Sequence, residues 1–313
     1  MSVRRFYMAA EAGFIEKKVL SSDGVHMLNG RVYLPEGEPK GLFHVVHGMT
    51  EYIARYDYFM DRMRKEGFLV FGYDHLGHGG TAANDDELGF IAHKDGWKRL
   101  VEDVGVFAGE IRKEYPGLPY YLLGHSMGSF IVRLAAKDVI KPDRLIVMGT
   151  GGPNPAAGIG VVLTKIIGGL KGEKHRSMLL GGIAFGSYNN RFKDENDERS
   201  WLTKDLEIRD RYRHDKWCTY IFTASAYRDL MYLTKNCNAG DWFKGFLEDV
   251  PVFLVSGADD PVGDYGKGVT KVHDSLANNG KNVRMKLYEN CRHEILNDTC
   301  RDEVIYDIIS FVG

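Results

Sequence analysis

The sequence predicts an α/β protein: a mostly parallel, doubly wound sheet with an N-terminal antiparallel hairpin and an inserted, mainly helical cap. Short apolar runs alternate with stretches of helical period from residue 41 onward. Two extended stretches within residues 14–34 flank Ser22-Asp23-Gly24, which is typical of a hairpin at a sheet edge. About a hundred residues between Gly149 and Pro251 then break the alternation, far more than an ordinary connection needs.

Each expected strand is a short apolar run, and each expected helix carries apolar residues along one face. After the hairpin, strands are expected at 42–47, 68–73, 120–123, 145–148, 252–255 and 284–288. Helices are expected at 52–66, along the stripe 97–111, from Met127 onward, at 269–277 and at 304–309. Gly67 and Pro116-Gly117 are typical stop signals after the first two helices.

The long interruption is predicted to be a cap inserted into the sheet domain. We expect residues 1–151 and 239–313 to form the core domain and residues 152–238 to form the cap, or lid. Residues 158–185 are rich in Gly, Ile, Leu and Val, whereas residues 191–213 are strongly charged. The apolar part suits the lining of a substrate pocket, transient contact with a membrane surface, or packing of the cap onto the sheet.

Composition limits the classes of function. The chain has 313 residues, of which 44% are hydrophobic, enough for a sizeable core. Lys+Arg number 41 against 43 Asp+Glu, and no basic stripe is visible, so nucleic acid is not expected as a partner. No apolar run approaches the roughly 18 residues that span a bilayer, so we expect a cytoplasmic protein without a transmembrane segment. The oligomeric state stays open.

The four cysteines give no sign of a metal site. Cys218, Cys237, Cys291 and Cys300 are widely spaced and contain no Cys-x-x-Cys pair. We therefore expect free thiols, with no metal and no cofactor.

A candidate nucleophile lies where an expected strand meets an expected helix. Residues 124–128 read Gly-His-Ser-Met-Gly, between the strand 120–123 and the helix that begins at Met127. A tight strand-to-helix turn exposes a serine hydroxyl, and glycines two residues on either side avoid collisions with neighbouring elements. Ser126 is therefore the predicted nucleophile. By alternation along the strand, His125 is expected to point elsewhere.

A nucleophilic serine needs a histidine base and a carboxylate that orients it, with the acid earlier in this strand order. The loop after strand 252–255 offers Asp259 and Asp260, and its spacing from Gly257 and from Pro261 favours Asp260. His293 follows the last expected strand and precedes the closing helix, so it is the predicted base.

Two backbone N–H groups are needed to stabilise the oxyanion of the reacting carbonyl. One is predicted to be that of Met127, which directly follows the serine. The other is predicted to be that of Met49, in the loop after strand 42–47.

Five segments together carry a family resemblance. They are His47-Gly48-Met49-Thr50-Glu51 with Arg55-Tyr56, Asp74-His75-Leu76-Gly77-His78-Gly79, Gly124-His125-Ser126-Met127-Gly128, Gly257-Ala258-Asp259-Asp260 and Arg292-His293-Glu294. The chain resembles the serine hydrolases of the α/β-hydrolase fold, in the monoacylglycerol lipase and lysophospholipase-like branch. The resemblance implies ester hydrolysis through an acyl-enzyme, with the triad on Ser126, Asp260 and His293 and oxyanion donors on Met49 and Met127. Glu51 and Arg55 are interpreted as a charged pair that holds the oxyanion loop.

The expected substrate is a small-molecule acyl ester such as a monoacylglycerol, a lysophospholipid or another single-chain ester. An esterase for aryl or small esters, an amidase and an acyltransferase of the same fold remain alternatives, because the triad defines acyl transfer while the pocket defines the substrate. A non-catalytic ligand-binding protein of this fold is the alternative from another class.

Overall fold

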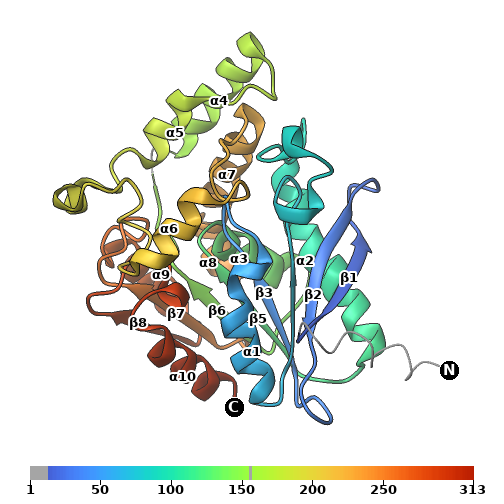
Figure 1. The fold of residues 1–313 in the computed structure, drawn as a ribbon. Coiled ribbons are helices and arrows are strands. Elements are labelled where there is room, and N and C mark those ends of the chain that lie inside the picture. Colours follow the sequence, from blue (N-terminus) through green and yellow to red (C-terminus); the bar gives the residue numbers. More distant parts are fainter. Residues whose placement is uncertain (1–12, 155–156) are drawn as a thin grey trace.

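A single eight-stranded sheet forms the centre of the protein (Figure 1), which the computed structural model describes for residues 13–154 and 157–313. The strand order is β1-β2-β4-β3-β5-β6-β7-β8. The strands are β1 (Ile15–Leu20), β2 (Met27–Tyr33), β3 (Leu42–Val46), β4 (Leu69–Tyr73), β5 (Tyr120–His125), β6 (Arg144–Met148), β7 (Val252–Gly257) and β8 (Val283–Tyr288). The pairs β1–β2 and β2–β4 are antiparallel and all others are parallel, so the predicted hairpin at the edge of a parallel sheet is confirmed.

Helices cover both faces of this sheet, as a doubly wound fold requires. The α-helices of the described residues are α1 (Asp57–Lys65), α2 (Gly96–Glu114), α3 (Met127–Asp138), α4 (Ala157–Lys171), α5 (Met178–Phe185), α6 (Leu206–His214), α7 (Ala224–Cys237), α8 (Gly240–Gly245), α9 (Lys267–Asn278) and α10 (Arg301–Val312). Buried residues of α1 and α10 belong to one core cluster, and those of α2, α3 and α9 belong to another. The sheet separates these two clusters.

The first expected helix, at 52–66, is only partly right. Tyr52 has an extended backbone, and a 3-10 turn at Ile53–Tyr56 precedes α1. The side chain of Asp74, at the end of β4, accepts a hydrogen bond of 2.8 Å from the N–H of Ile53. This tertiary contact fixes the start of the segment in a way that helical periodicity does not reveal.

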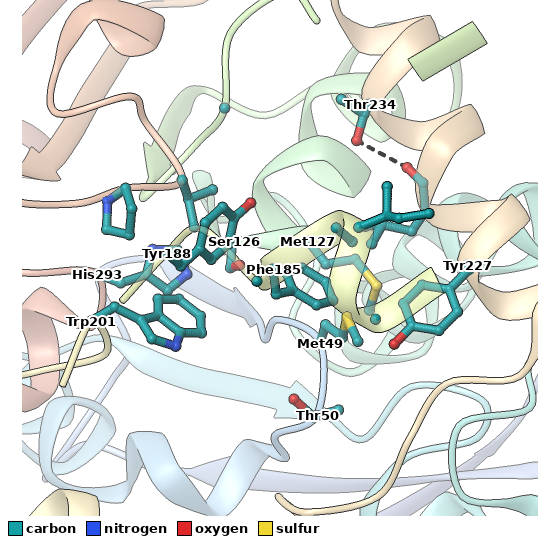
Figure 2. Close-up of a pocket in the computed structure, with 18 of the residues that line it drawn as sticks. Met49, Thr50, Ser126, Met127, Phe185, Tyr188, Trp201, Tyr227, Thr234 and His293 are labelled. Atoms are coloured by element: carbon teal, nitrogen blue, oxygen red, sulfur yellow. Dashed lines mark hydrogen bonds between the residues drawn. The ribbon is translucent and has the colours of Figure 1, made fainter. Parts of the chain in front are cut away.

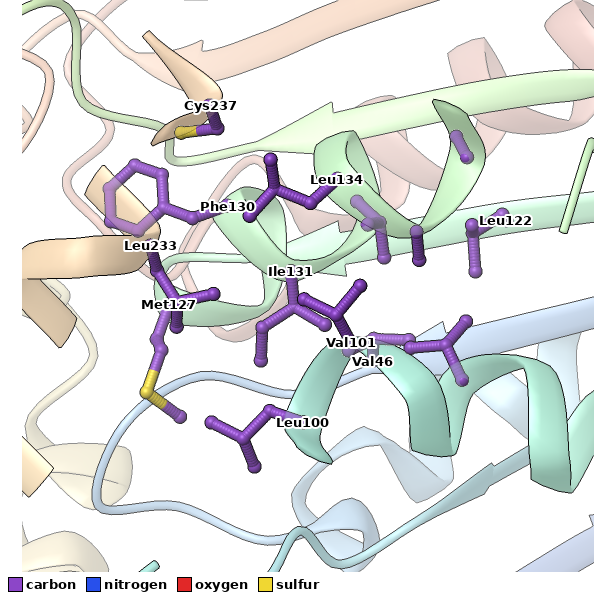
Figure 3. Packing of buried hydrophobic residues seen from close by; sticks show 14 of the residues in the cluster. Val46, Leu100, Val101, Leu122, Met127, Phe130, Ile131, Leu134, Leu233 and Cys237 are labelled. Atoms are coloured by element: carbon purple, nitrogen blue, oxygen red, sulfur yellow. The ribbon is translucent and has the colours of Figure 1, made fainter. Parts of the chain in front are cut away.

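The central strands are buried on both faces. Every residue of β3, β4 and β5 is buried, which explains why these strands read as continuous apolar runs. Figure 3 shows Ile131 of α3 and Val101 of α2 in the same cluster as Val46 of β3. The elements that carry the loops of the site therefore pack on a common core.

The insertion between β6 and β7 is helical, and its helices differ in how deeply they are anchored. Figure 1 shows α4 and α5 at the far end of the molecule from α10. Helix α7 instead buries Leu230, Leu233 and Cys237 in the same core cluster as Phe130 of α3. Among the described residues, no helix combines the length and apolar character that crossing a membrane requires.

The cysteine expectation is wrong for one pair. Cys291 and Cys300 form a disulfide, with their Cα atoms 6.5 Å apart, whereas Cys218 and Cys237 are free and buried. The turn after β8 folds back toward the start of α10 and brings the two sulfurs together. A spacing of nine residues matches no local motif, so the sequence did not indicate this bridge.

The packing of Phe71 on β4 gives a test of this core. Phe71 is fully buried (0% exposed) and lies against the rings of His44 and Phe107, with ring centroids 4.4 and 6.1 Å away. Replacing it by alanine (Phe71→Ala) is expected to lower the free energy of unfolding by about 3–5 kcal/mol, because the lost aromatic contacts leave a cavity. Urea unfolding followed by circular dichroism measures this change.

The matched control is Tyr306→Ala on α10, where the side chain is 72% exposed. Its effect should stay within about 0.5 kcal/mol. Equal losses in the two variants would contradict the packing described here.

Candidate active site

Ser126 occupies a strained turn between β5 and α3. Its backbone angles are φ 54° and ψ −119°, a conformation that costs a non-glycine residue about 1–3 kcal/mol. A Cβ at Gly124 would lie 2.3 Å from the carbonyl oxygen of Gly128, and a Cβ at Gly128 would lie 2.2 Å from that of Val46. Both glycines are therefore required for β5, α3 and β3 to approach this closely, as the pentapeptide indicated.

The loop after β3 passes directly beside this serine. A Cβ on Gly48 would come within 2.9 Å of the Cβ of Ser126, so this position also requires glycine. Met49 and Met127 line the same cavity as Ser126, and Figure 2 shows them between Ser126 and Tyr227. Met127 is the first residue of α3, and the N–H groups of a first helical turn have no partner within the helix.

His293 and Asp260 are in direct contact. The Nδ1 atom of His293 lies 2.9 Å from Oδ2 of Asp260, which is completely buried. Asp260 also accepts hydrogen bonds from the hydroxyl of Ser256 (3.1 Å) and from the N–H of Val262 (2.8 Å). These three donors hold the carboxylate in one orientation, and the contact with the imidazole comes from Asp260 and not from Asp259.

The imidazole of His293 faces the same cavity as Ser126. Figure 2 shows His293 beside Ser126, with Trp201 and Tyr188 next to them, and the Trp201 and His293 ring centroids are 5.2 Å apart. A Cβ on Gly149, at the end of β6, would lie only 3.2 Å from Cε1 of His293. Four of the five predicted site residues thus line the same cavity: Met49, Ser126, Met127 and His293. The fifth, Asp260, contacts His293 from outside the cavity lining.

Strand alternation predicted that His125 points away from the site, and this prediction is wrong. Its Nε2 atom lies 3.2 Å from the carbonyl oxygen of His293, and its Nδ1 atom lies 3.0 Å from Glu51. Burial alone would lower the pKa of His125, but the carboxylate of Glu51 and its hydrogen bond outweigh burial and raise the pKa above its ordinary value. His125 thus supports the backbone of His293, a contact between residues 168 positions apart that no spacing in the sequence reveals.

Glu51 and Arg55 form the charged pair that the sequence suggested, and a third group completes it. The guanidinium of Arg55 donates to Glu51 at 3.1 Å and to both carboxylate oxygens of Glu294 at 2.8 and 2.6 Å. Glu51 in turn accepts the N–H of Gly48 at 2.5 Å. The loop after β3 is therefore linked to the loop that carries His293.

A large cavity opens onto this group of residues. Its volume is about 1040 Å³. Much of the lining away from Ser126 and His293 is apolar or aromatic and comes from α4, α5 and α7: Ile159, Leu163, Leu180, Ile183, Phe185, Tyr227, Leu230 and Met231. The helices of the insertion thus form the apolar side of the cavity, and the loops after the strands form the side that carries Ser126 and His293.

Known proteins share this arrangement of the chain. A family model described as serine aminopeptidase, S33, matches residues 37–300. Over 127 residues, which are 38% of this chain, it is 34% identical to a monoglyceride lipase of Rattus norvegicus, and the match covers 37% of that relative's length. A monoacylglycerol lipase of Mycolicibacterium smegmatis is 26% identical over 284 residues, which cover 90% of this chain and 91% of the relative.

A solved structure is similar over almost the whole length. The carboxyl esterase from Bacillus coagulans, in complex with glycerol, superposes with a TM-score of 0.90 at 29% identity, covering 96% of this chain and 98% of the esterase. The sheet order, the turn at Ser126 and the match over residues 37–300 lead to one assignment. The chain belongs to the serine aminopeptidase S33 family and has the α/β-hydrolase fold.

Proposed function

We propose that this protein is a serine carboxylic-ester hydrolase for single-chain acyl esters, such as monoacylglycerols and lysophospholipids. The observation that carries this proposal is the cavity of about 1040 Å³, with an apolar side from the inserted helices and Ser126 and His293 on its other side. Such a shape suits one long apolar chain whose polar end lies at the serine. The similarity to a monoacylglycerol lipase over 90% of the chain supports the same substrate class.

The proposed reaction runs in two steps. In the first, the hydroxyl oxygen of Ser126 bonds to the ester carbonyl carbon while His293 takes the hydroxyl proton, and the alcohol leaves with that proton. In the second, water attacks the acyl-serine and gives its proton to His293, which returns it to Ser126 as the carboxylic acid leaves. The N–H groups of Met49 and Met127 stabilise the oxyanion in both steps, each contributing about 3 kcal/mol.

Asp260 is proposed to hold His293 in the tautomer that this reaction needs. The 2.9 Å contact between Oδ2 of Asp260 and Nδ1 of His293 supports this role, because a proton on Nδ1 leaves Nε2 free to act as the base. The other donors to Asp260, from Ser256 and Val262, keep the carboxylate oriented when the imidazole becomes charged.

We further propose that residues 152–238 act as the cap of this enzyme, in the cytoplasm, and touch a lipid surface through α4 and α5. Besides the residues that line the cavity, these two helices carry large apolar side chains that are between 52% and 81% exposed: Val162, Ile166, Leu170 and Leu179. Lys165 and Lys171 are exposed on the same helix, α4. An apolar surface flanked by lysines suits an interface with anionic lipids.

Removing the hydroxyl of Ser126 tests the reaction. The variant Ser126→Ala is expected to lose roughly 10⁴-fold or more of kcat on p-nitrophenyl butyrate, because no acyl-enzyme forms. A panel of monoacylglycerols, lysophospholipids and aryl esters, measured with the wild-type protein, identifies the substrate class. Wild-type protein that turns over none of these esters would favour a ligand-binding role instead.

The two neighbouring aspartates provide a matched comparison. Asp260→Asn is expected to lower kcat by about 10⁴-fold, because the amide favours the wrong imidazole tautomer. Asp259→Asn removes the same charge one residue away and should leave kcat within about twofold. The order of the two effects, measured on the same ester, decides between the candidates, and the reverse order would refute the proposed role of Asp260.

Charge placed on the apolar surface of α4 tests the lipid contact. The double variant Ile166→Glu/Leu170→Glu should bind anionic vesicles at least about tenfold more weakly in a sedimentation assay, since burying two carboxylates in lipid is costly. Leu206→Glu, at an equally exposed position on α6, is the control and should bind like the wild-type protein. Unchanged binding of the double variant would exclude α4 as the lipid-facing surface.

A further inference from the structure

A cluster of charged side chains joins the inserted segment to the loop that carries His293. Arg292 directly precedes His293, and its side chain is only 6% exposed. Arg209 of α6 is 5% exposed, and Glu195, at the end of a 3-10 helix (Asn190–Glu195), is 29% exposed and lies between the two arginines. The reaction proposed above uses none of these three groups.

We propose that Glu195 is a positioning residue that holds His293 in place through Arg292. The charged part of the cap, residues 191–213, thereby becomes part of the active site. The inference rests on the proposed function, because it assumes that His293 is the base.

The contact between Glu195 and Arg292 is bidentate. Nη1 of Arg292 donates to Oε2 of Glu195 at 3.0 Å, and Nη2 donates to Oε1. The same Nη1 also donates to the carbonyl oxygen of Ser200 at 2.6 Å, and the guanidinium lies 4.1 Å from the ring centroid of Phe192. The guanidinium of Arg292 is therefore hydrogen-bonded along its edge and packed against an aromatic ring on its face, which leaves it little freedom to rotate.

Arg209 fixes Glu195 from the other side. Its Nη1 atom donates to Oε2 of Glu195 at 2.8 Å and to the hydroxyl of Ser200 at 2.7 Å, and it lies 3.3 Å from Asp197. Hydrogen bonds from Arg292, the largest cause, lower the pKa of Glu195 to about 2 against the effect of burial, and Arg209 adds to this lowering. Glu195 is therefore ionised at neutral pH and neutralises part of the charge of two arginines.

Backbone contacts carry this restraint to the histidine. The N–H of Glu294 donates to the carbonyl oxygen of Leu202 at 2.8 Å, and the N–H of His293 donates to the carbonyl oxygen of Trp201 at 3.4 Å. The rings of Trp201 and His293 lie 5.2 Å apart between their centroids. Residues on both sides of the imidazole are thus attached to the same stretch of the cap, and a small shift of a catalytic base costs a large factor in rate.

Removing the charge of Glu195 tests the inference. Glu195→Gln should lower kcat on p-nitrophenyl butyrate by roughly tenfold or more, with KM changed by less than about threefold, because binding of this short ester is not affected.

Asp194→Asn is the matched control, since it removes the same charge from the neighbouring exposed position. It should keep the wild-type kcat and KM. Two further variants guard against a simple loss of folding. Glu195→Asp keeps the charge and should recover part of kcat. Arg292→Lys keeps a cation but loses the bidentate contact, so it should lower kcat. Thermal unfolding of all variants shows which of them are folded.

The outcomes separate this inference from the proposed function. A wild-type protein without ester hydrolysis removes the proposed function and this inference with it. An active wild-type protein, with folded Glu195→Gln equal to Asp194→Asn in kcat, overturns only the role of Glu195. If Glu195→Gln does not fold, an Arg292→Lys variant that is folded and fully active overturns it equally.

Discussion

The close approach of β3, β5 and α3 around Ser126 is the constraint on which the rest of the site depends. Ser126 keeps a positive φ of 54° because Gly124 and Gly128 leave no Cβ between neighbouring backbones. The energetic cost of about 1–3 kcal/mol is offset by a core in which every residue of β5 is buried. The result is a hydroxyl at the carboxyl edge of the sheet, where the loops after the other strands converge.

A second layer of contacts joins these loops to one another. Arg55 bridges Glu51 and Glu294, and His125 connects Glu51 with the carbonyl of His293. Burial alone would raise the pKa of Glu51, but His125 and Arg55 lower it below its ordinary value, so this carboxylate is ionised at neutral pH. The loop after β3 and the loop that carries His293 are therefore held as one unit by buried charged groups.

Much of this arrangement follows from the sequence, and the reason is topological. Ser126, Asp260 and His293 each lie just after a strand, and the carboxyl ends of parallel strands meet at one edge of the sheet, so order and spacing select them. The position of His125 and the hydrogen bonds of Glu195 to Arg209 and Arg292 could not be predicted in the same way. Their partners are far away in the chain, and no periodicity encodes which side chains meet there. The role of the inserted helices could not be predicted either, because it also depends on contacts between residues that are far apart in the chain.

The central claim is that Ser126 is the nucleophile of this site. Mass spectrometry of the protein after reaction with a fluorophosphonate tests it most directly, because the adduct marks the residue that attacked. We expect one adduct per folded chain, located on Ser126 and absent after denaturation before labelling. A folded protein that stays unlabelled, or an adduct on any other residue, would contradict this account.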